Sequence, residues 1–261
     1  MNTHHISQRL TLKILLILAF LHSSIVWSQS EPIRIGGLIH LPPYYDERTE
    51  TGIVIELIKE IFNEVNLKST INISASNKRG IKLLLNNSID TLIGNKNDDY
   101  YNSFKGIYLS DTYLHFVDCA ISLKKSKLSD SKDLSYLKGK SIWAFKGARH
   151  ALGKTYLNAI KDNPQYTEQV DQLIQYKALM KKRVDVVISD RNIFSTQVYK
   201  QAVPISKFSF FSVSETTPRA LRFIDKKLRD KFNLGLKKIK KNGVYSKVLL
   251  KYNHLYKPNC N

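Results

Sequence analysis

The chain of 261 residues is 43% hydrophobic and 24% charged, and its 11 glycines and 7 prolines are too few for a collagen-like or low-complexity protein. A mean hydropathy of −0.28, without a second long apolar run, excludes a polytopic membrane protein. The net charge of +19 comes from Lys and Arg residues dispersed along the chain. Because no nucleic-acid-binding motif accompanies them, we expect no nucleic-acid partner.

The N-terminal segment has the features of a secretory signal peptide. Arg9 and Lys13 precede eight apolar residues at 14–21, a run too short to cross a bilayer, which requires roughly 20 residues. Small residues suited to cleavage follow at Val26 and Ser28. We therefore expect residues 1–28 to be removed and the mature protein to be periplasmic. The alternative is an uncleaved membrane anchor.

The remaining chain alternates predicted strands and helices. Apolar residues at helical spacing or in alternation predict strands at 33–38, 67–74, 90–94 and 113–123 and helices at 52–65 and 79–87. After a polar linker at 124–133, they predict strands at 141–145, 185–189 and 208–213 and helices at 148–161, 171–182, 191–200 and 225–241. This alternation indicates an α/β fold with largely parallel sheets, and the restart after the linker indicates two lobes.

Cys119 and Cys260 are the only two cysteines. In an oxidising compartment such a pair can form a disulfide. Cys119 lies in an apolar, strand-like run, where a buried free thiol is the alternative, so the residues leave the pairing open. The histidines and cysteines are scattered, without metal-ligand spacing, and we expect neither a metal nor another cofactor.

Seven segments in order resemble the bacterial extracellular solute-binding proteins of the polar-amino-acid ABC-transporter type. They are Pro42-Pro43-Tyr44-Tyr45, Gly52 with its helix, and the segments 90–94, 109–113, 137–141, 183–190 and 231–252. The resemblance implies a type II periplasmic-binding-protein fold, whose two lobes close on a ligand about two hinge crossings. Here the crossings are expected near 119–123 and 207–213. The large lobe would be 31–119 plus 208–261, and the small lobe 120–207.

The resemblance also indicates ligand-binding residues on the first lobe. Tyr44 matches an aromatic residue that stacks on the ligand, although it can instead pack over the helix that starts at Gly52. Gly94 and Asn95 match a loop whose backbone and small polar side chain reach the ligand. The alternative for this pair is an ordinary turn that ends a strand.

On the second lobe, the turn Lys146-Gly147-Ala148 would direct free backbone N–H groups and the positive end of a helix toward the cleft. Asp190 matches a position that accepts the substrate ammonium in the family. Asp is also a favoured N-cap residue, so Asp190 can instead cap the helix that follows it.

One expected residue is absent. The family's amino-acid binders carry an arginine seven residues before the position of Ser110, but here that residue is Ser103. A neutral hydroxyl cannot replace a planar charged fork. Arg149, next to the turn at Ala148, and Arg79 are the candidates to compensate. The alternative for each is a solvent-facing side chain.

Together these features predict a monomeric binding protein that captures a small polar, amino-acid-like or anionic solute for an ABC permease in the inner membrane. A periplasmic lyase or dehydratase on the same fold is the competing hypothesis, for which His40 and His150 are the only histidines expected near the cleft. The sequence is also compatible with a ligand-sensing protein and with a protein that binds anionic surfaces in a salt-dependent way. It leaves the ligand open.

Overall fold

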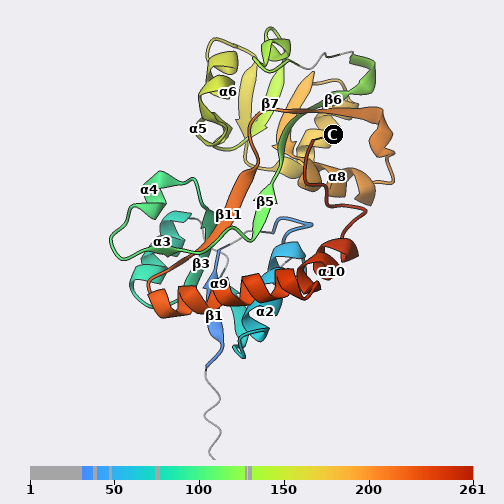
Figure 1. Cartoon of the computed structure of the whole chain (residues 1–261). Coiled ribbons are helices and arrows are strands. Elements are labelled where there is room, and N and C mark those ends of the chain that lie inside the picture. Colours follow the sequence, from blue (N-terminus) through green and yellow to red (C-terminus); the bar gives the residue numbers. More distant parts are fainter. Residues whose placement is uncertain are drawn as a thin grey trace, which may run out of the picture. The chain divides into compact units, whose positions relative to one another are not determined.

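The computed structural model describes residues 31–37, 40–46, 49–73, 77–126, 128 and 131–260. The predicted signal peptide, residues 1–28, lies outside them. Pro32–Asn261 form one structural unit that contains two sheets, shown in Figure 1. None of the described helices is long and apolar enough to cross a membrane.

The first sheet has the strand order β2-β1-β3-β11-β4, and β5 also pairs with β11. Its central strand β1 is parallel to β2 and β3, whereas β11 is antiparallel to β3, β4 and β5. The strands are β1 Ile33–Gly36, β2 Ser69–Ile73, β3 Thr91–Asn95, β4 Tyr108–Leu109, β5 Leu114–Phe116 and β11 Thr217–Phe223. The associated helices are α2 Ile53–Asn63, α3 Asn77–Leu85, α4 Asp99–Asn102, α9 Lys226–Lys241 and α10 Val244–Lys251.

The second sheet has the order β10-β6-β9-β7-β8. Strand β7 is parallel to β8 and β9, and β6 is antiparallel to β9 and β10. The strands are β6 Asp118–Leu123, β7 Ile142–Phe145, β8 Tyr166–Gln169, β9 Val186–Asp190 and β10 Phe208–Ser212. Helices α5 Ala148–Ala151, α6 Gly153–Ile160, α7 Gln175–Met180 and α8 Arg191–Lys200 accompany this sheet, together with 3-10 turns at Lys124–Ser126, Ser135–Leu137, Gln172–Ile174 and Ile205–Lys207.

Both sheets are mixed, although the sequence predicted largely parallel ones. The parallel pairs come from strand–helix–strand units, such as β1 and β3 or β7 and β9. The antiparallel pairs involve β6, β10 and β11, the strands next to the crossings between sheets. Strands β6 and β11 enter their sheets from the other sheet, so no crossover helix sets them parallel to a preceding strand of the same sheet.

The chain passes between the sheets from β5 to β6 and again from β10 to β11, as Figure 1 shows. The second passage differs from the expected position. Strand β10 pairs along its length with β6, from Phe208 with Leu123 to Ser212 with Cys119. Residues 208–212 therefore belong to the second sheet, and the passage follows them.

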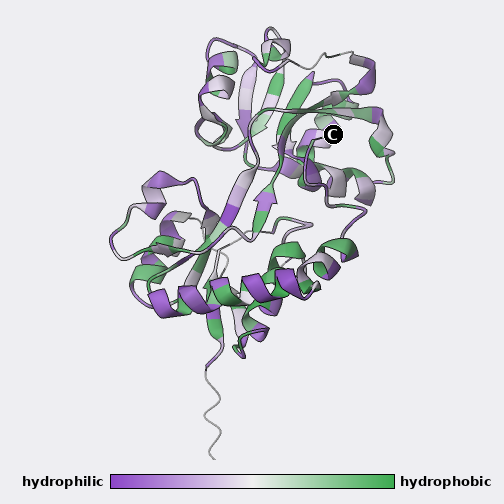
Figure 2. Cartoon of the chain, in the orientation of Figure 1, coloured by the Kyte–Doolittle hydropathy of each residue, from purple (hydrophilic) through white to green (hydrophobic). Residues whose placement is uncertain are grey.

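The apolar core of the first sheet is built by the amphipathic helices that cover it. Helix α2 buries Ile53, Val54, Leu57 and others against the sheet, and α9 buries Phe232, Leu236 and Ile239. The four lysines of α9 at 237–241 are exposed and form its solvated face. Figure 2 shows the two faces of α9 as alternating bands. Gly235 has no side chain that would meet the Ile61 carbonyl, so α9 can lie directly against α2.

The C-terminal segment returns to the second sheet. After α10, the chain reaches α8, where the Lys257 N–H donates to the Asn192 side-chain oxygen at 2.7 Å and the Arg191 guanidinium donates to the Cys260 carbonyl. Cys260 and Cys119 form a disulfide, with both residues buried. The last described residues of the segment 208–261 thus contact elements of the second sheet.

Candidate functional site

A cleft of about 590 Å³ lies between elements of the two sheets. One wall is the loop after β3, together with the passage from β10 to β11, and the other wall is formed by α5 and the start of α6. The charged side chains along it are Asp98, Asp99, Glu215, His150 and Lys154. The lining therefore carries more carboxylates than lysines or arginines.

A smaller cavity of about 130 Å³ shares Asn95, Ala151 and Thr217 with this outer cleft. It is called the inner cavity below, and it too is lined from both sheets. Its remaining lining residues are Leu41, Phe116, Asp118, Phe145, Gln172, Asp190, Ile193 and Arg219. Apolar side chains and buried charges thus meet at the boundary between the sheets.

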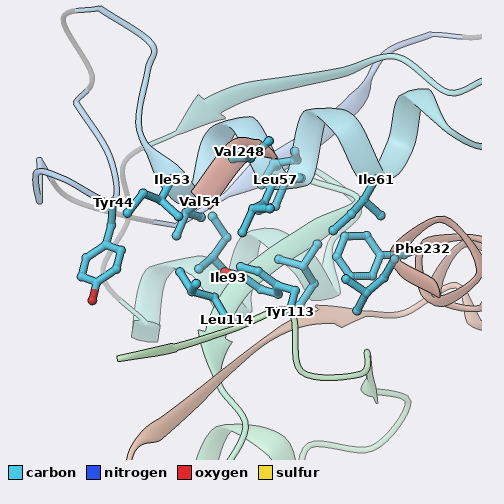
Figure 3. Packing of buried hydrophobic residues seen from close by; sticks show 14 of the residues in the cluster. Tyr44, Ile53, Val54, Leu57, Ile61, Ile93, Tyr113, Leu114, Phe232 and Val248 are labelled. Carbon is cyan, nitrogen blue, oxygen red and sulfur yellow. The ribbon is translucent and has the colours of Figure 1, made fainter. Parts of the chain in front are cut away.

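Tyr44 is completely buried and lines neither cavity. Its ring stacks on Phe116 with the centroids 3.9 Å apart, and its hydroxyl donates to Asp190 at 2.9 Å and accepts from the Asn192 amide at 2.9 Å. Figure 3 shows Tyr44 at the edge of the core cluster with its hydroxyl directed away from it. Burial, together with the charge of Asp190, raises the pKa of Tyr44 well above its usual value. Tyr44 is therefore a packed core residue in this structure, the alternative to stacking on a ligand.

The carboxylate of Asp190 is likewise hydrogen-bonded by other residues of the chain. Besides Tyr44, its carboxylate accepts from the backbone N–H groups of Val117 at 2.7 Å, Asn192 at 2.8 Å and Ile193 at 3.0 Å. The last two contacts make Asp190 the N-cap of α8. Burial raises the pKa of Asp190, although the hydrogen bonds from Ile193 and Val117 oppose this rise. Its oxygens are occupied, so the capping alternative holds in this structure.

Two of the backbone N–H groups at the turn of Gly147 are bonded within the chain. The Glu168 carboxylate on β8 accepts from the Gly147 N–H at 2.8 Å and from the Arg149 N–H at 3.0 Å. Partial burial would raise the pKa of Glu168, but these two backbone hydrogen bonds outweigh it and lower the pKa. The chain thus supplies its own carboxylate to two donors of this turn, and a ligand contact at Ala148 stays a prediction. Ala148 itself is buried in the second core.

Arg149 is similarly engaged. Its guanidinium lies 4.5 Å from the centroid of the Tyr166 ring, and Arg149 lines neither cavity. The helix expected at 148–161 is in fact two helices, since Gly153 has a φ of 82°, a backbone conformation suited to glycine. Arg79 is exposed on α3 and likewise lies outside both linings.

The loop after β3 is held by a buried arginine that the sequence reasoning missed. The Arg222 guanidinium donates to the Asn102 side chain at 2.8 Å and to the Asn95 carbonyl at 3.2 Å, and it lies 3.5 Å from Asp98. A Cβ atom at Gly94 would overlap this guanidinium, which explains the glycine. Asn95 is thereby placed at the junction of the two cavities. Ser103 follows α4 on the exposed side of this loop.

Two further residues were missed and lie directly at the inner cavity. Arg219 packs its guanidinium over Phe116, 4.2 Å from the ring centroid, and Asp118 starts β6 beside it. The sequence feature that could have indicated them is the pair of arginines in the otherwise largely apolar strand at 217–223. Residues 219 and 222 are three apart, so they lie on opposite faces of the strand. One therefore supports the loop while the other faces the cavity.

Among the described residues, no cluster of acidic, histidine or cysteine side chains is arranged to hold a metal ion. His150 lines the outer cleft. His40 is paired with Asp46, its Nδ1 lying 3.5 Å from a carboxylate oxygen.

The sequence model of the bacterial extracellular solute-binding proteins, family 3, matches residues 33–254. None of the curated protein sequences matches the chain.

Solved structures share the fold at low sequence identity. A histidine kinase sensor domain with similarity to periplasmic binding proteins aligns with a TM-score of 0.68 at 16% identity, covering 86% of this chain and 96% of that domain. An ancestral arginine-binding protein bound to arginine aligns with a TM-score of 0.63 at 21% sequence identity. The alignment covers 88% of this chain and 100% of that protein. A polar amino acid ABC uptake transporter substrate-binding protein from Streptococcus thermophilus aligns with a TM-score of 0.61 at 20% sequence identity, covering 86% of each chain. The expected two-lobed α/β fold of the type II periplasmic-binding proteins is confirmed.

Proposed function

Since the chain belongs to the bacterial extracellular solute-binding proteins, family 3, we propose that it captures a small polar solute in the cleft between its two sheets. After export to the periplasm, the monomer would deliver this solute to an ABC permease in the inner membrane. In the ligand-sensing alternative, the same cleft has the same role and a signalling partner replaces the permease.

The two sheets are proposed as the centres of two lobes that close on the solute. Strand pairing supports a first lobe of about 32–117 plus 217–252 and a second lobe of about 118–216. The observation that carries the proposal is that both cavities are lined from both sheets. A solute bound there touches both lobes at once, and such contact favours the closed arrangement over the open one.

The charges of the lining narrow the class of solute. In the outer cleft Asp98 lies 3.5 Å from Arg222, while Asp99 and Glu215 outnumber the single lysine, Lys154. This balance favours a solute with a cationic group over a purely anionic one. The turn at Gly147, from which anion binding was expected, is occupied by Glu168. Similarity to arginine-binding and polar-amino-acid-binding structures supports an amino acid.

The test is a thermal-shift screen of the refolded mature protein against amino acids, polyamines, and di- and tricarboxylates, at low and high salt. A solute at a hundred times its dissociation constant stabilises the folded state by about 2.7 kcal/mol, which raises the melting temperature measurably. We expect amino acids to stabilise the protein at both salt concentrations. Failure of every solute to do so contradicts the proposal.

A pair of variants locates the binding. Ala151 is exposed and lines both cavities, so Ala151→Trp should fill the cleft and remove the ligand-induced shift while leaving the ligand-free melting temperature nearly unchanged. The matched control is Leu157→Trp, an exposed position on α6 outside both linings. The control should keep the full ligand-induced shift.

One observation favours a second candidate function, a lyase or dehydratase. Burial raises the pKa of Asp118 to about 7, and the nearby Asp190 adds to the effect. A carboxyl group in that range, at the wall of a cavity, is suited to general acid catalysis. Incubation with cyclohexadienyl acids such as prephenate, followed by product analysis, distinguishes the two functions, because a binding protein returns its ligand unchanged.

A further inference from the structure

The segment of α9 and α10, residues 226–251, carries about half of the net charge of the protein. It contains ten lysines and arginines and a single acidic residue, Asp230, whereas the whole chain has a net charge of +19. Asp230 is already paired with Arg229, at 2.7 Å. The positive charge is therefore concentrated on these two helices, where α10 continues from the end of α9 (Figure 1).

The lysines of α9 share one side of the helix with an exposed leucine. Leu234 is 50% exposed, and residues three, four or seven positions away from it lie on the same side. These residues are Lys227, Lys231, Lys237, Lys238 and Lys241, all exposed. The opposite side is buried in the core. Leu234 and its five lysines are called the basic face below.

Helix α10 extends the basic face with the same combination of residues. Leu250 is 64% exposed, and its neighbours Lys247 and Lys251 are exposed as well. A single exposed leucine needs no explanation. Here, however, each of two leucines is flanked by lysines on helices that contact one another.

Most of these lysines have no charged partner within the described part of the chain. At the edges of the face, Lys238 lies 4.0 Å from Glu64 and Lys251 lies 2.8 Å from Glu56. No ion pair with a described residue involves Lys227, Lys231, Lys237, Lys241 or Lys247. Like charges on one helix face repel one another, and a negatively charged surface relieves this repulsion.

A bilayer that contains anionic phospholipids matches both features of the face. Its phosphate groups attract lysines that lie within a Debye length of about 8–10 Å, and its interface accepts leucine side chains. A nucleic acid offers phosphate groups without an apolar layer, so both leucines would remain in water. The leucines therefore favour the bilayer.

We propose that the basic face and its extension on α10 bind the surface of a bilayer containing anionic phospholipids, with the lysines at the lipid phosphates and Leu234 and Leu250 between the head groups. None of these residues lines the outer cleft or the inner cavity. The contact is thus a second surface of the protein, and it does not rest on the proposed solute-binding function. Because it uses charge and two leucines rather than a lipid anchor, binding is reversible.

The test is flotation of the mature protein with lipid vesicles, since the apolar N-terminal segment would itself bind lipid. Vesicles of phosphatidylcholine alone are compared with vesicles in which about a third of the lipid is phosphatidylglycerol. The wild-type protein should partition at least about tenfold more strongly into the anionic vesicles, and high salt should remove most of this difference. Equal partitioning into both kinds of vesicle overturns the proposal.

The double variant Lys237→Gln/Lys241→Gln removes two charges from the basic face. Each lysine near an anionic surface changes partitioning by about fivefold, so the variant should bind anionic vesicles about 25-fold less strongly. The matched control is Lys177→Gln/Lys181→Gln, which removes two exposed lysines at the same spacing in and directly after α7. The control should keep most of the binding. Equal losses in the two variants overturn the assignment to α9, because net charge alone would then decide.

Leu234→Gln separates insertion from charge attraction. Loss of this leucine should weaken binding to anionic vesicles by about fivefold and leave the salt dependence unchanged. Leu157→Gln, at an exposed leucine of α6, is the control and should bind as the wild type does. Unchanged vesicle binding by Leu234→Gln, with tight binding of duplex DNA by the wild type, overturns the bilayer in favour of a nucleic acid.

All four substitutions place glutamine, a good helix former, at exposed positions in or directly after helices. Their ligand-free melting temperatures and their response to the solutes of the screen should therefore equal those of the wild type. A protein that responds to a solute but does not bind anionic vesicles overturns this proposal alone. One that binds the vesicles through α9 and responds to no solute overturns only the proposed function.

Discussion

The boundary between the two sheets has two sides that differ in how their polar groups are satisfied. On one side, Tyr44, Asp190 and Asn192 bond to one another, to backbone N–H groups and to the C-terminal segment. On the other side, Arg219 and Asp118 face a cavity with few partners. Asp118 and Asp190 are buried, Arg219 is partly buried, and all three line the inner cavity, but Asp190 has the most hydrogen-bond partners.

Under the proposed function, this difference would separate a structural role from a binding role. A network in which every member is paired fixes the geometry of the boundary and leaves nothing for a ligand. A buried group without a partner lowers the stability of the ligand-free protein and is retained where a ligand completes it. Asp190 and Arg149 resemble binding residues in the sequence, but the fold gives them partners.

The largest expected effect concerns the paired side, to which the disulfide fastens the C-terminal segment. Cys119 and Cys260 are 141 residues apart, and closing such a loop restricts the unfolded chain by about 5 kcal/mol in the loop-entropy model. The double variant Cys119→Ala/Cys260→Ala should lose stability of this order in urea unfolding at equilibrium. An unchanged midpoint would show that the bond does not constrain the unfolded chain.

A second prediction uses the charges of the open side. Because the pKa of Asp118 is about 7 in the folded protein against an ordinary 3.8, the folded state holds a proton that the unfolded state loses above pH 4. The contribution of Asp118 to stability is therefore complete below pH 4 and falls as the pH rises toward 7. At about 1.4 kcal/mol per pKa unit, the loss amounts to as much as about 4 kcal/mol.

Asp118→Asn should remove this pH dependence, so the variant becomes more stable than the wild type at pH 7 and matches it near pH 4. Chemical unfolding at five or more pH values between 4 and 8 measures the difference. Asp111→Asn, at an exposed aspartate, is the control and should follow the wild-type curve. Parallel curves for the wild type and Asp118→Asn would contradict the raised pKa that burial gives Asp118.

The smallest effect is expected from Tyr44→Phe. The variant keeps the ring stacked on Phe116 and removes the hydroxyl that donates to Asp190. Loss of one buried hydrogen bond to a charged group should cost about 1–3 kcal/mol of stability. The dissociation constant of the solute should change less than twofold, because Tyr44 lines neither cavity. A large loss of affinity with unchanged stability would assign Tyr44 to the binding side instead.

Local patterns sufficed for most of the elements. The helix at Arg191–Lys200 and the start of the strand at Phe208 are observed as predicted, since hydrophobic periodicity and an N-cap aspartate are properties of a short segment. The break at Gly153 and the mixed sheets were not predicted. They depend on which strands meet at the crossings, and a linear pattern does not contain this information.

The candidate site divides in the same way. Asn95 was predicted to reach the ligand and lines both cavities, and its contact with a ligand stays a prediction. Arg219 was not predicted, since one arginine in a strand is not distinguishable from another until the partners of both are known. Only the fold shows that Arg222 holds a loop and that Arg219 faces a cavity.

The sequence by itself determined the fold class, the family and the identity of most helices and strands, because these follow from periodicity and ordered segments along the chain. The tertiary structure decided which charges are available. Glu168 reaches the Gly147 turn, and Tyr44 reaches Asp190 across 146 residues. The availability of a charged group depends on all of its neighbours in space, and residues far apart in the chain become neighbours only when it folds.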